Sequence, residues 1–229
     1  MIHFCYIFVQ QALIMQKDLS NYRKVYQKNQ LHEQNLTDNP MELFRDWFYE
    51  AEKNEDCIEV NAMNLATHGL DEYPKSRIVL LKRFTWEGFV FYTNYQSEKG
   101  KAIAQNPKVS LSFFWPKLER QIKIKGIAEK LPDNLSDGYF ETRPRGSKIG
   151  AWASPQSEVI PSKQYLKERF DRFEKKFEDK EVPRPKHWGG FMVKPIEIEF
   201  WQGRPNRLHD RIRFKLQEDF NWKKERLGS

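Results

Sequence analysis

The chain has 229 residues, of which 39% are hydrophobic, 14% aromatic and 31% charged, and its formal net charge is +7. This length allows one large domain or two small ones, and the composition excludes a disordered chain. A basic surface attracts nucleic acid, acidic membrane or phosphorylated small molecules alike, so the positions of the cations matter more than their sum. Two cysteines, Cys5 and Cys57, are too few for a disulfide scaffold and favour a reducing cytoplasm.

Residues 1–15 are apolar and carry no Lys, Arg, Asp or Glu. They lack the basic start and the cleavage site of a secretory signal, and they are too short to span a membrane. We expect residues 1–19 to be an N-terminal extension that is disordered or mis-started, with Met15 as the true start; a weak signal anchor is the alternative. Residues 20–229 are predicted to form a single domain.

The first predicted element is a helix that begins after Asn39, with Pro40 and Glu42 in its first turn. The polar segment 17–36 before it could be a helix or a flexible arm. Further helices are predicted at 97–105, 133–143 and 162–178, and a loop at 182–186. Period-two patterns predict strands at 58–67, 75–84, 88–94, 108–115, 119–130, 189–201, 210–217 and 219–226.

Six to eight strands joined mostly by short turns favour an antiparallel sheet, and closure into a barrel would remove its exposed edges. The expected fold is therefore mainly β with flanking helices (α+β). The sequence has no GxGxxG or P-loop motif, no GxSxG nucleophile motif and no set of metal ligands.

Two groups of cations could bind phosphate. Arg77 and Lys82 lie at the ends of one predicted strand and would point to opposite faces unless a bulge intervenes. A core strand with solubilising ends is the alternative. Ser97 and Lys99 lie at a predicted helix start, where backbone N–H groups bind phosphate, although an ordinary helix cap explains them equally well.

A third group could form a phosphate cage, because Tyr139 and Arg143 share a helix face and Ser147 follows in a glycine-containing turn. Cations favoured by the dipole at a helix C-terminus are the alternative. In the fourth group, Arg207, His209 and Arg211 alternate, so an extended chain would point all three the same way. Three potential cations on one face would repel one another, and an anionic or electron-rich ligand explains this arrangement most easily. A solvated strand end is the alternative.

In this order the groups resemble the pyridoxine/pyridoxamine 5'-phosphate oxidase family. The matching segments are RIVLLK (77–82), FYTN (91–94), LERQ (118–121), RPRGSKIGAWAS (143–154), PQS (155–157), WGGF (188–191) and FWQGRPNRLHDR (200–211). Each motif alone is weak, whereas the ordered set is highly specific and extends from about Tyr22 to the C-terminus.

The resemblance implies a split β-barrel that dimerises and binds FMN at the dimer interface. It implies an oxidase that converts pyridoxine or pyridoxamine 5'-phosphate to pyridoxal 5'-phosphate with O2, and neither nucleic acid, membrane nor metal as a partner. By position, the FMN contacts would be Arg77, Ile78, Val79, Leu80, Lys82, Tyr92, Thr93, Lys99, Gln121, Gln156, Ser157, Trp201 and Arg211. The substrate contacts would be Lys82, Tyr139, Arg143 and Ser147 at the phosphate, Arg207 and His209 as catalytic residues at the pyridine ring, and Arg23 and Tyr26 in a covering segment.

The sequence departs from the family pattern at Glu98, where many members carry arginine. A carboxylate there would weaken phosphate binding unless it turns away. Two other classes of protein stay open: a different flavin- or deazaflavin-dependent oxidoreductase on the same barrel, and a protein that binds FMN or pyridoxal phosphate without turnover.

Overall fold

The computed structural model describes residues 17–229, so most of the expected N-terminal extension, Met15 included, lies outside the described residues. The helices are α2 (Pro40–Glu52), α3 (Glu98–Gln105), α4 (Asp133–Glu141), α5 (Arg145–Ala153) and α6 (Lys163–Lys176), with 3-10 turns η1 (Glu33–Asn35) and η2 (Pro205–Arg207). The strands are β1 (Ala62–His68), β2 (Pro74–Leu80), β3 (Arg83–Thr85), β4 (Gly88–Asn94), β5 (Lys108–Trp115), β6 (Arg120–Lys130), β7 (Trp188–Gln202), β8 (Asp210–Leu216) and β9 (Trp222–Arg226).

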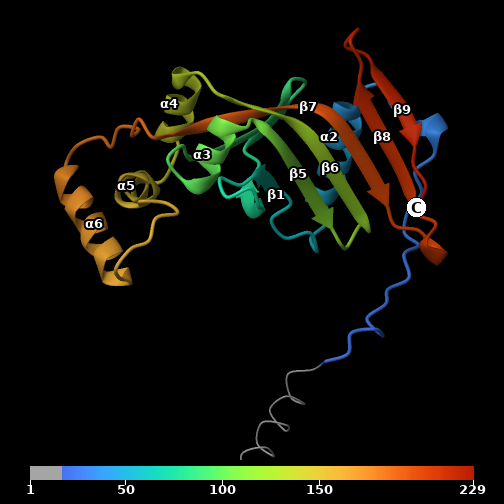
Figure 1. Cartoon of the computed structure of the whole chain (residues 1–229), viewed down its shortest axis with the longest axis horizontal. Helices are drawn as coiled ribbons and strands as arrows, with labels where there is room; N and C mark the ends of the chain where they lie inside the picture. The colour runs from blue at the N-terminus through green and yellow to red at the C-terminus, as the bar shows by residue number, and fades with distance from the viewer. Residues whose placement is uncertain (1–16) are drawn as a thin grey trace, which may run out of the picture.

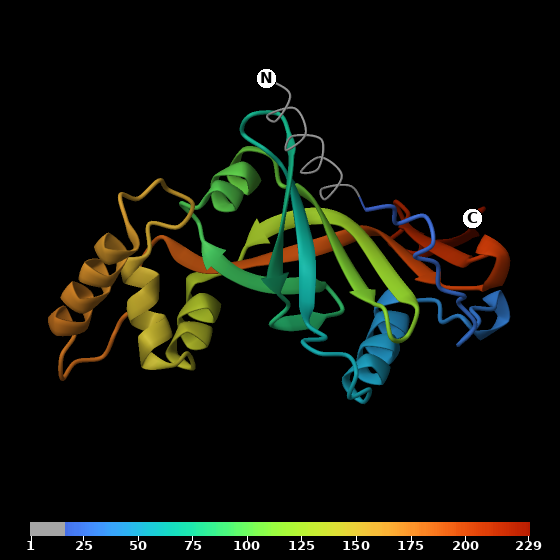
Figure 2. The same ribbon diagram turned by 90° about the horizontal axis from the view of Figure 1, so that it is seen from below.

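The nine strands of the described chain form one antiparallel sheet in the order β2-β1-β5-β6-β7-β4-β3, with β8 and β9 continuing from β7. The sheet curls into a half-barrel, which confirms the predicted antiparallel split-barrel class (Figure 2). The long strand β7 crosses the molecule (Figure 1). It pairs with β4 near its start and with β8 near its end.

Helix α2 fills the inside of the curled sheet. The Asn39 side chain accepts a hydrogen bond from the Met41 N–H at 2.9 Å, and Pro40 occupies the first turn, as the sequence predicted. Its buried face includes Phe44, whose ring lies 4.8 Å from that of Phe89, and Trp47, which packs against β7. These aromatic contacts hold α2 against β4 and β7, the two strands that also carry site residues.

The predicted strand 75–84 is wrong as a single element, because the chain changes partner at Leu81 and Lys82. Strand β2 pairs with β1, whereas β3 forms a hairpin with β4 through the expected turn before Gly88. The Lys82 N–H donates to the Val90 carbonyl at 2.8 Å, which turns the chain from one side of the sheet to the other.

Strand boundaries differ elsewhere as well. The first strand begins at 62 rather than 58, since residues 58–61 form turns and Glu59 has a φ of 51°. The last two strands are separated by a turn at 217–221, which shortens both.

Helix α5 was not predicted, because Pro144, Gly146 and Gly150 indicate a loop. Tertiary contacts override that preference. The Arg145 guanidinium donates to the carbonyls of Phe177 (2.5 Å) and Lys180 (2.9 Å), and Ile149 is buried in a small second core with α6. Ser147 therefore lies on a helix rather than in a turn.

No helix in residues 17–229 has the length and apolar character needed to cross a bilayer. The prediction of one domain over 20–229 stays a prediction.

Candidate active site

A cavity of about 480 Å³ lies between the β2 edge of the sheet, β4 and the helices α4 and α5. This volume is in the range of small-molecule sites. Three of its lining side chains are cations and none is a carboxylate. The lining residues are Ile78, Val79, Leu80, Lys82, Tyr92, Thr93, Asn94, Lys99, Tyr139, Arg143, Ser147, Gly150, Ala151, Ser154, Gln156 and Trp188. The structure thus brings together eleven residues that the sequence placed in a site.

One side of the cavity is an aromatic stack that supports Arg143. The rings of Tyr92 and Tyr139 lie 3.9 Å apart at 17°, and Trp188 lies nearly parallel to both. The Arg143 guanidinium lies 4.4 Å from the Trp188 ring centre. Its Nη1 is buried without a hydrogen-bond partner among the described residues. Burial lowers the pKa of Arg143, with Tyr139 opposing, and no carboxylate among residues 17–229 forms an ion pair with this cation.

The other side is built around Lys99, which is 8% exposed. Its Nζ lies 3.3 Å from both Ser97 Oγ and Gln156 Oε1, and Ser97 caps α3, which was the alternative explanation of this serine. Burial and then the neighbouring charge of Arg77 lower the pKa of Lys99, while Glu98 opposes. A buried amine next to a guanidinium favours an anionic ligand.

Glu98 lies beside this group rather than in it. Its carboxylate is 3.7 Å from Lys75 Nζ, and it does not line the cavity. The carboxylate therefore pairs with Lys75 outside the cavity lining, although its charge still acts on Lys99.

A second cluster lies where β7 ends and β8 begins. Trp201 and His209 rings lie 4.7 Å apart, and Tyr26 packs edge-on against both, at 5.6 and 5.8 Å. His209 Nδ1 accepts a hydrogen bond from the Arg204 backbone N–H at 3.0 Å. Since a backbone N–H can only donate, neutral His209 must carry its proton on Nε2. Burial, followed by the charge of Arg207, lowers the pKa of His209, while Asp210 opposes.

The expected alternation of Arg207, His209 and Arg211 along an extended chain is wrong. Arg207 belongs to a 3-10 turn in which it and Asn206 have φ values of 62° and 57°. Arg211 instead joins a row across the outer face of the sheet, because Gln121 pairs with Trp201 and Trp201 pairs with Arg211.

Glu199, 7% exposed, orients this row. It accepts from Arg211 Nε at 2.9 Å and pairs with Lys123 Nζ at 2.8 Å.

The cavity includes the first residue of β7 and the second cluster lies near its end, and Figure 1 shows β7 crossing the molecule. Trp188 belongs to the cavity and Trp201 to the cluster, thirteen residues later on the same strand. At about 3.3 Å per residue the strand between them is roughly 40 Å long, much longer than a small ligand, so one ligand should not contact both within one chain.

Comparisons with known proteins identify the family of the chain. Residues 50–177 match the family model described as pyridoxamine 5'-phosphate oxidase, and residues 188–228 match its C-terminal dimerisation region. Curated pyridoxine/pyridoxamine 5'-phosphate oxidases from Flavobacterium psychrophilum and Flavobacterium johnsoniae are 61% and 59% identical, each over 93% of this chain and 99% of the relative. The chain belongs to the pyridoxine/pyridoxamine 5'-phosphate oxidase family.

Solved structures show the same architecture. PhzG from Burkholderia lata, solved with tetrahydrophenazine-1-carboxylic acid, superposes with a TM-score of 0.80 at 25% identity, over 87% of this chain and 98% of that one. An FMN-binding protein of Nostoc punctiforme related to pyridoxamine 5'-phosphate oxidase has a TM-score of 0.64 at 14% identity, over 81% and 97%. At this low identity, the likeness to the Nostoc punctiforme protein supports only the split-barrel fold.

The residues of this pyridoxine/pyridoxamine 5'-phosphate oxidase family member fit an anionic cofactor such as FMN. The fit is seen in the unpartnered Arg143 Nη1, the buried Lys99 amine and the absence of any carboxylate among the residues that line the cavity. No group of three or more potential metal ligands occurs in the described part of the chain.

Some predicted residues lie outside both groups. Arg23 is exposed, and its Nε donates to the Ser20 carbonyl in its own turn. Ser157 follows Gln156 at a φ of 73° but does not line the cavity. Arg77 donates to Thr67 Oγ1 at 2.8 Å and acts on the cavity through its charge.

Sequence reasoning missed Trp188 as a site residue. The two glycines that follow Trp188 could have indicated a close approach of the backbone to other residues. A side chain on Gly190 would collide with Leu131 and with Tyr92, which lines the cavity.

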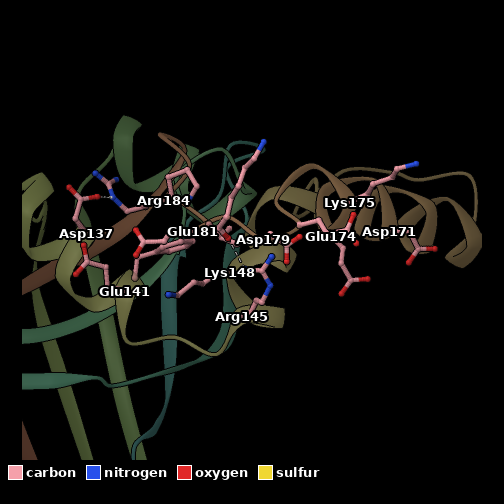
Figure 3. Close-up of a pocket in the computed structure, with 15 residues that line it drawn as sticks. Asp137, Glu141, Arg145, Lys148, Asp171, Glu174, Lys175, Asp179, Glu181 and Arg184 are labelled. Carbon is pink, nitrogen blue, oxygen red and sulfur yellow. Dashed lines mark hydrogen bonds and ion pairs between the residues drawn. The ribbon is translucent and has the colours of Figure 1, made fainter.

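A larger cavity of about 1460 Å³ lies between α4, α5, α6 and the segment 178–184. Figure 3 shows acidic and basic side chains mixed along its walls, including Glu141 and Lys148. It contains none of the predicted site residues. We assign the candidate site to the smaller cavity, whose uncompensated positive charge selects an anion.

Proposed function

We propose that the protein is an FMN-dependent oxidase that converts pyridoxine or pyridoxamine 5'-phosphate to pyridoxal 5'-phosphate. The observation that carries the proposal is the cavity with three cations and no carboxylate, found in a chain 61% identical to a curated oxidase of this name. The low cysteine count supports the cytoplasm as the proposed compartment.

Two phosphates need two groups of donors, and the cavity offers both. Lys99, with Arg77 behind it, would hold the FMN phosphate near Thr93 and Gln156. Arg143 with Tyr139, Ser147 and Lys82 would hold the substrate phosphate. When bound, FMN would supply the acceptor for the hydride of the substrate C4' carbon and pass the electrons to O2 to form H2O2, while the hydroxyl or amine proton would leave to solvent and hydrolysis of the imine from the amine substrate would release ammonia.

The second cluster would complete the site from a second copy of the chain. A homodimer is supported by the match of residues 188–228 to a dimerisation region, and by the separation of the two groups within one chain. Trp201, Arg211 and Gln121 share one outer face and would meet the partner's cavity there.

The chain's own residues would orient the substrate and control charge. Neutral His209, with its proton on Nε2, would donate a hydrogen bond to the substrate hydroxyl or amine rather than accept a proton from it. Arg207 would stabilise negative charge at the ring. Fixing the phosphate places the reacting carbon, which is a proximity effect.

Anaerobic addition of pyridoxine 5'-phosphate to the FMN-loaded protein tests the proposal. Bleaching of the flavin, followed by oxygen uptake and pyridoxal 5'-phosphate formation in air, is the expected result, with unphosphorylated pyridoxine as the matched control. Bound FMN without bleaching would indicate a non-catalytic binding protein, and bleaching by other substrates alone would indicate a different oxidoreductase.

A further inference from the structure

The carboxylate of Glu119 provides most of the hydrogen bonds that attach the N-terminal segment 24–28 to the body of the protein, and Lys24 Nζ also donates to the Pro116 carbonyl at 3.4 Å. Oε2 of Glu119 accepts hydrogen bonds from the consecutive backbone N–H groups of Gln27 (2.8 Å) and Lys28 (3.0 Å). Its Oε1 lies 3.4 Å from Lys24 Nζ. The segment 29–31 has separate attachments, because Arg204 and Arg226 donate to its carbonyls. Glu119 thus holds residues 24–28, which precede the separately attached residues 29–31.

Glu119 is built into the protein in an unusual way for a glutamate. It lies between β5 and β6 with a φ of 58° and is 2% exposed. Its own backbone carbonyl accepts from the Gly203 N–H at 2.7 Å. Burial raises the pKa of Glu119, but the hydrogen bonds from Lys28, Gln27 and Lys24 outweigh it, so the pKa lies below its usual value. The buried group is therefore an anion whose partners belong to the N-terminal segment.

The attachment decides where Tyr26 lies. Tyr26 directly precedes the two anchored N–H groups, and its ring lies on Gly203, where an added Cβ would come within 2.7 Å of Tyr26 Cγ. From there it packs against Trp201 and His209. A glycine at 203 and an anion at 119 are the two requirements for this position of the tyrosine.

We propose that Glu119 is a positioning residue that anchors segment 24–28 so that Tyr26 closes the substrate-binding cluster of Trp201 and His209. This inference rests on the proposed function for its link to the substrate, and on contacts alone for the anchoring. Glu119 does not itself touch the cavity.

Replacement by Ala removes the anchor and keeps Cβ, so that it adds no backbone strain. Loss of two charge-assisted hydrogen bonds should raise KM for pyridoxine 5'-phosphate about tenfold, and more than it lowers kcat. FMN affinity should change less than KM, because Lys99 and Gln156, which would hold the FMN phosphate, lie in the cavity and away from Glu119. Glu119→Gln, which keeps an oxygen acceptor, should recover much of the effect. Glu129→Ala is the matched control, since Glu129 is a half-exposed ion-paired glutamate of β6.

A double-mutant cycle separates positioning from a general structural role. In a Tyr26→Ala background, Glu119→Ala should change KM by less than about twofold, because both act through the same contact. Multiplicative effects on KM, or loss of FMN with KM unchanged, would overturn the assignment.

Trypsin cleavage after Lys24 and Lys28 provides a measurement that does not depend on the reaction. Glu119→Ala should speed this cleavage about tenfold, while the Glu129→Ala control leaves it unchanged. If the wild-type protein does not oxidise the substrate, the proposed function fails, but the rate of trypsin cleavage still tests whether Glu119 anchors segment 24–28. Unchanged cleavage in Glu119→Ala would refute it.

Discussion

Replacing Arg143 with Met should remove a substrate contact without destabilising the protein. The free protein leaves Arg143 Nη1 buried and unpartnered among the described residues, and a buried unpaired polar group costs about 1–3 kcal/mol. The substitution loses the cation–π contact with Trp188, 4.4 Å away, which is worth about 0.5–2 kcal/mol. These contributions oppose each other, so the free energy of unfolding should change by less than about 1 kcal/mol.

Binding should respond much more strongly. A hydrogen bond to a charged group contributes about 1.5–3 kcal/mol, which corresponds to a rise in KM of roughly 10- to 150-fold. Affinity for FMN should change little, because Lys99 and Gln156 lie on the other side of the cavity. The assays are steady-state kinetics with pyridoxine 5'-phosphate, FMN titration and thermal unfolding.

Arg145→Met is the matched control two residues away. Arg145 donates to the Phe177 and Lys180 carbonyls, so its loss should lower the melting temperature and leave KM nearly unchanged. The reasoning is refuted if Arg143→Met destabilises the protein more than Arg145→Met does, while KM for the phosphorylated substrate stays the same.

Two further predictions concern the second cluster. Burial and the charge of Arg207 lower the pKa of His209, and protonation at Nδ1 would break its hydrogen bond from Arg204, so kcat/KM should be flat at neutral pH and fall only below the ordinary histidine pKa of about 6.5. Arg207→Ala should move that fall to higher pH and lower turnover more than FMN affinity. A pH profile that this variant leaves unchanged would contradict the assignment. Mixing Arg143→Met and His209→Ala subunits should restore up to about a quarter of the wild-type rate. Half of the dimers are then mixed, and each mixed dimer has one intact site of its two. A site formed within one chain would show no recovery in the same rate assay.

Much of the architecture could be predicted from sequence. The cap at Asn39, the aromatic face of α2 and the strand alternation of β6 depend on neighbours in the chain, and the structure has all three. The outer row of Gln121, Trp201 and Arg211 follows from period-two alternation once the strands are paired. Local periodicity therefore determined the antiparallel class of the fold, whereas the candidate site residues followed from the resemblance to the oxidase family.

The exceptions are positions where distant contacts override local preference. Helix α5 forms despite its glycines because Arg145 and Ile149 are held by α6 and the segment after it. Likewise, the break at Lys82 follows from a change of partner strand.

The sequence by itself determined that cations, aromatic residues and an ordered set of motifs belong to a protein that binds phosphorylated ligands. Only the tertiary structure decided that Lys99 and Arg143 share one cavity, that His209 carries its proton on Nε2 and that Glu119 holds Tyr26 in place. The physical reason is that these facts depend on burial and on hydrogen bonds between residues far apart in the chain, which no local pattern specifies.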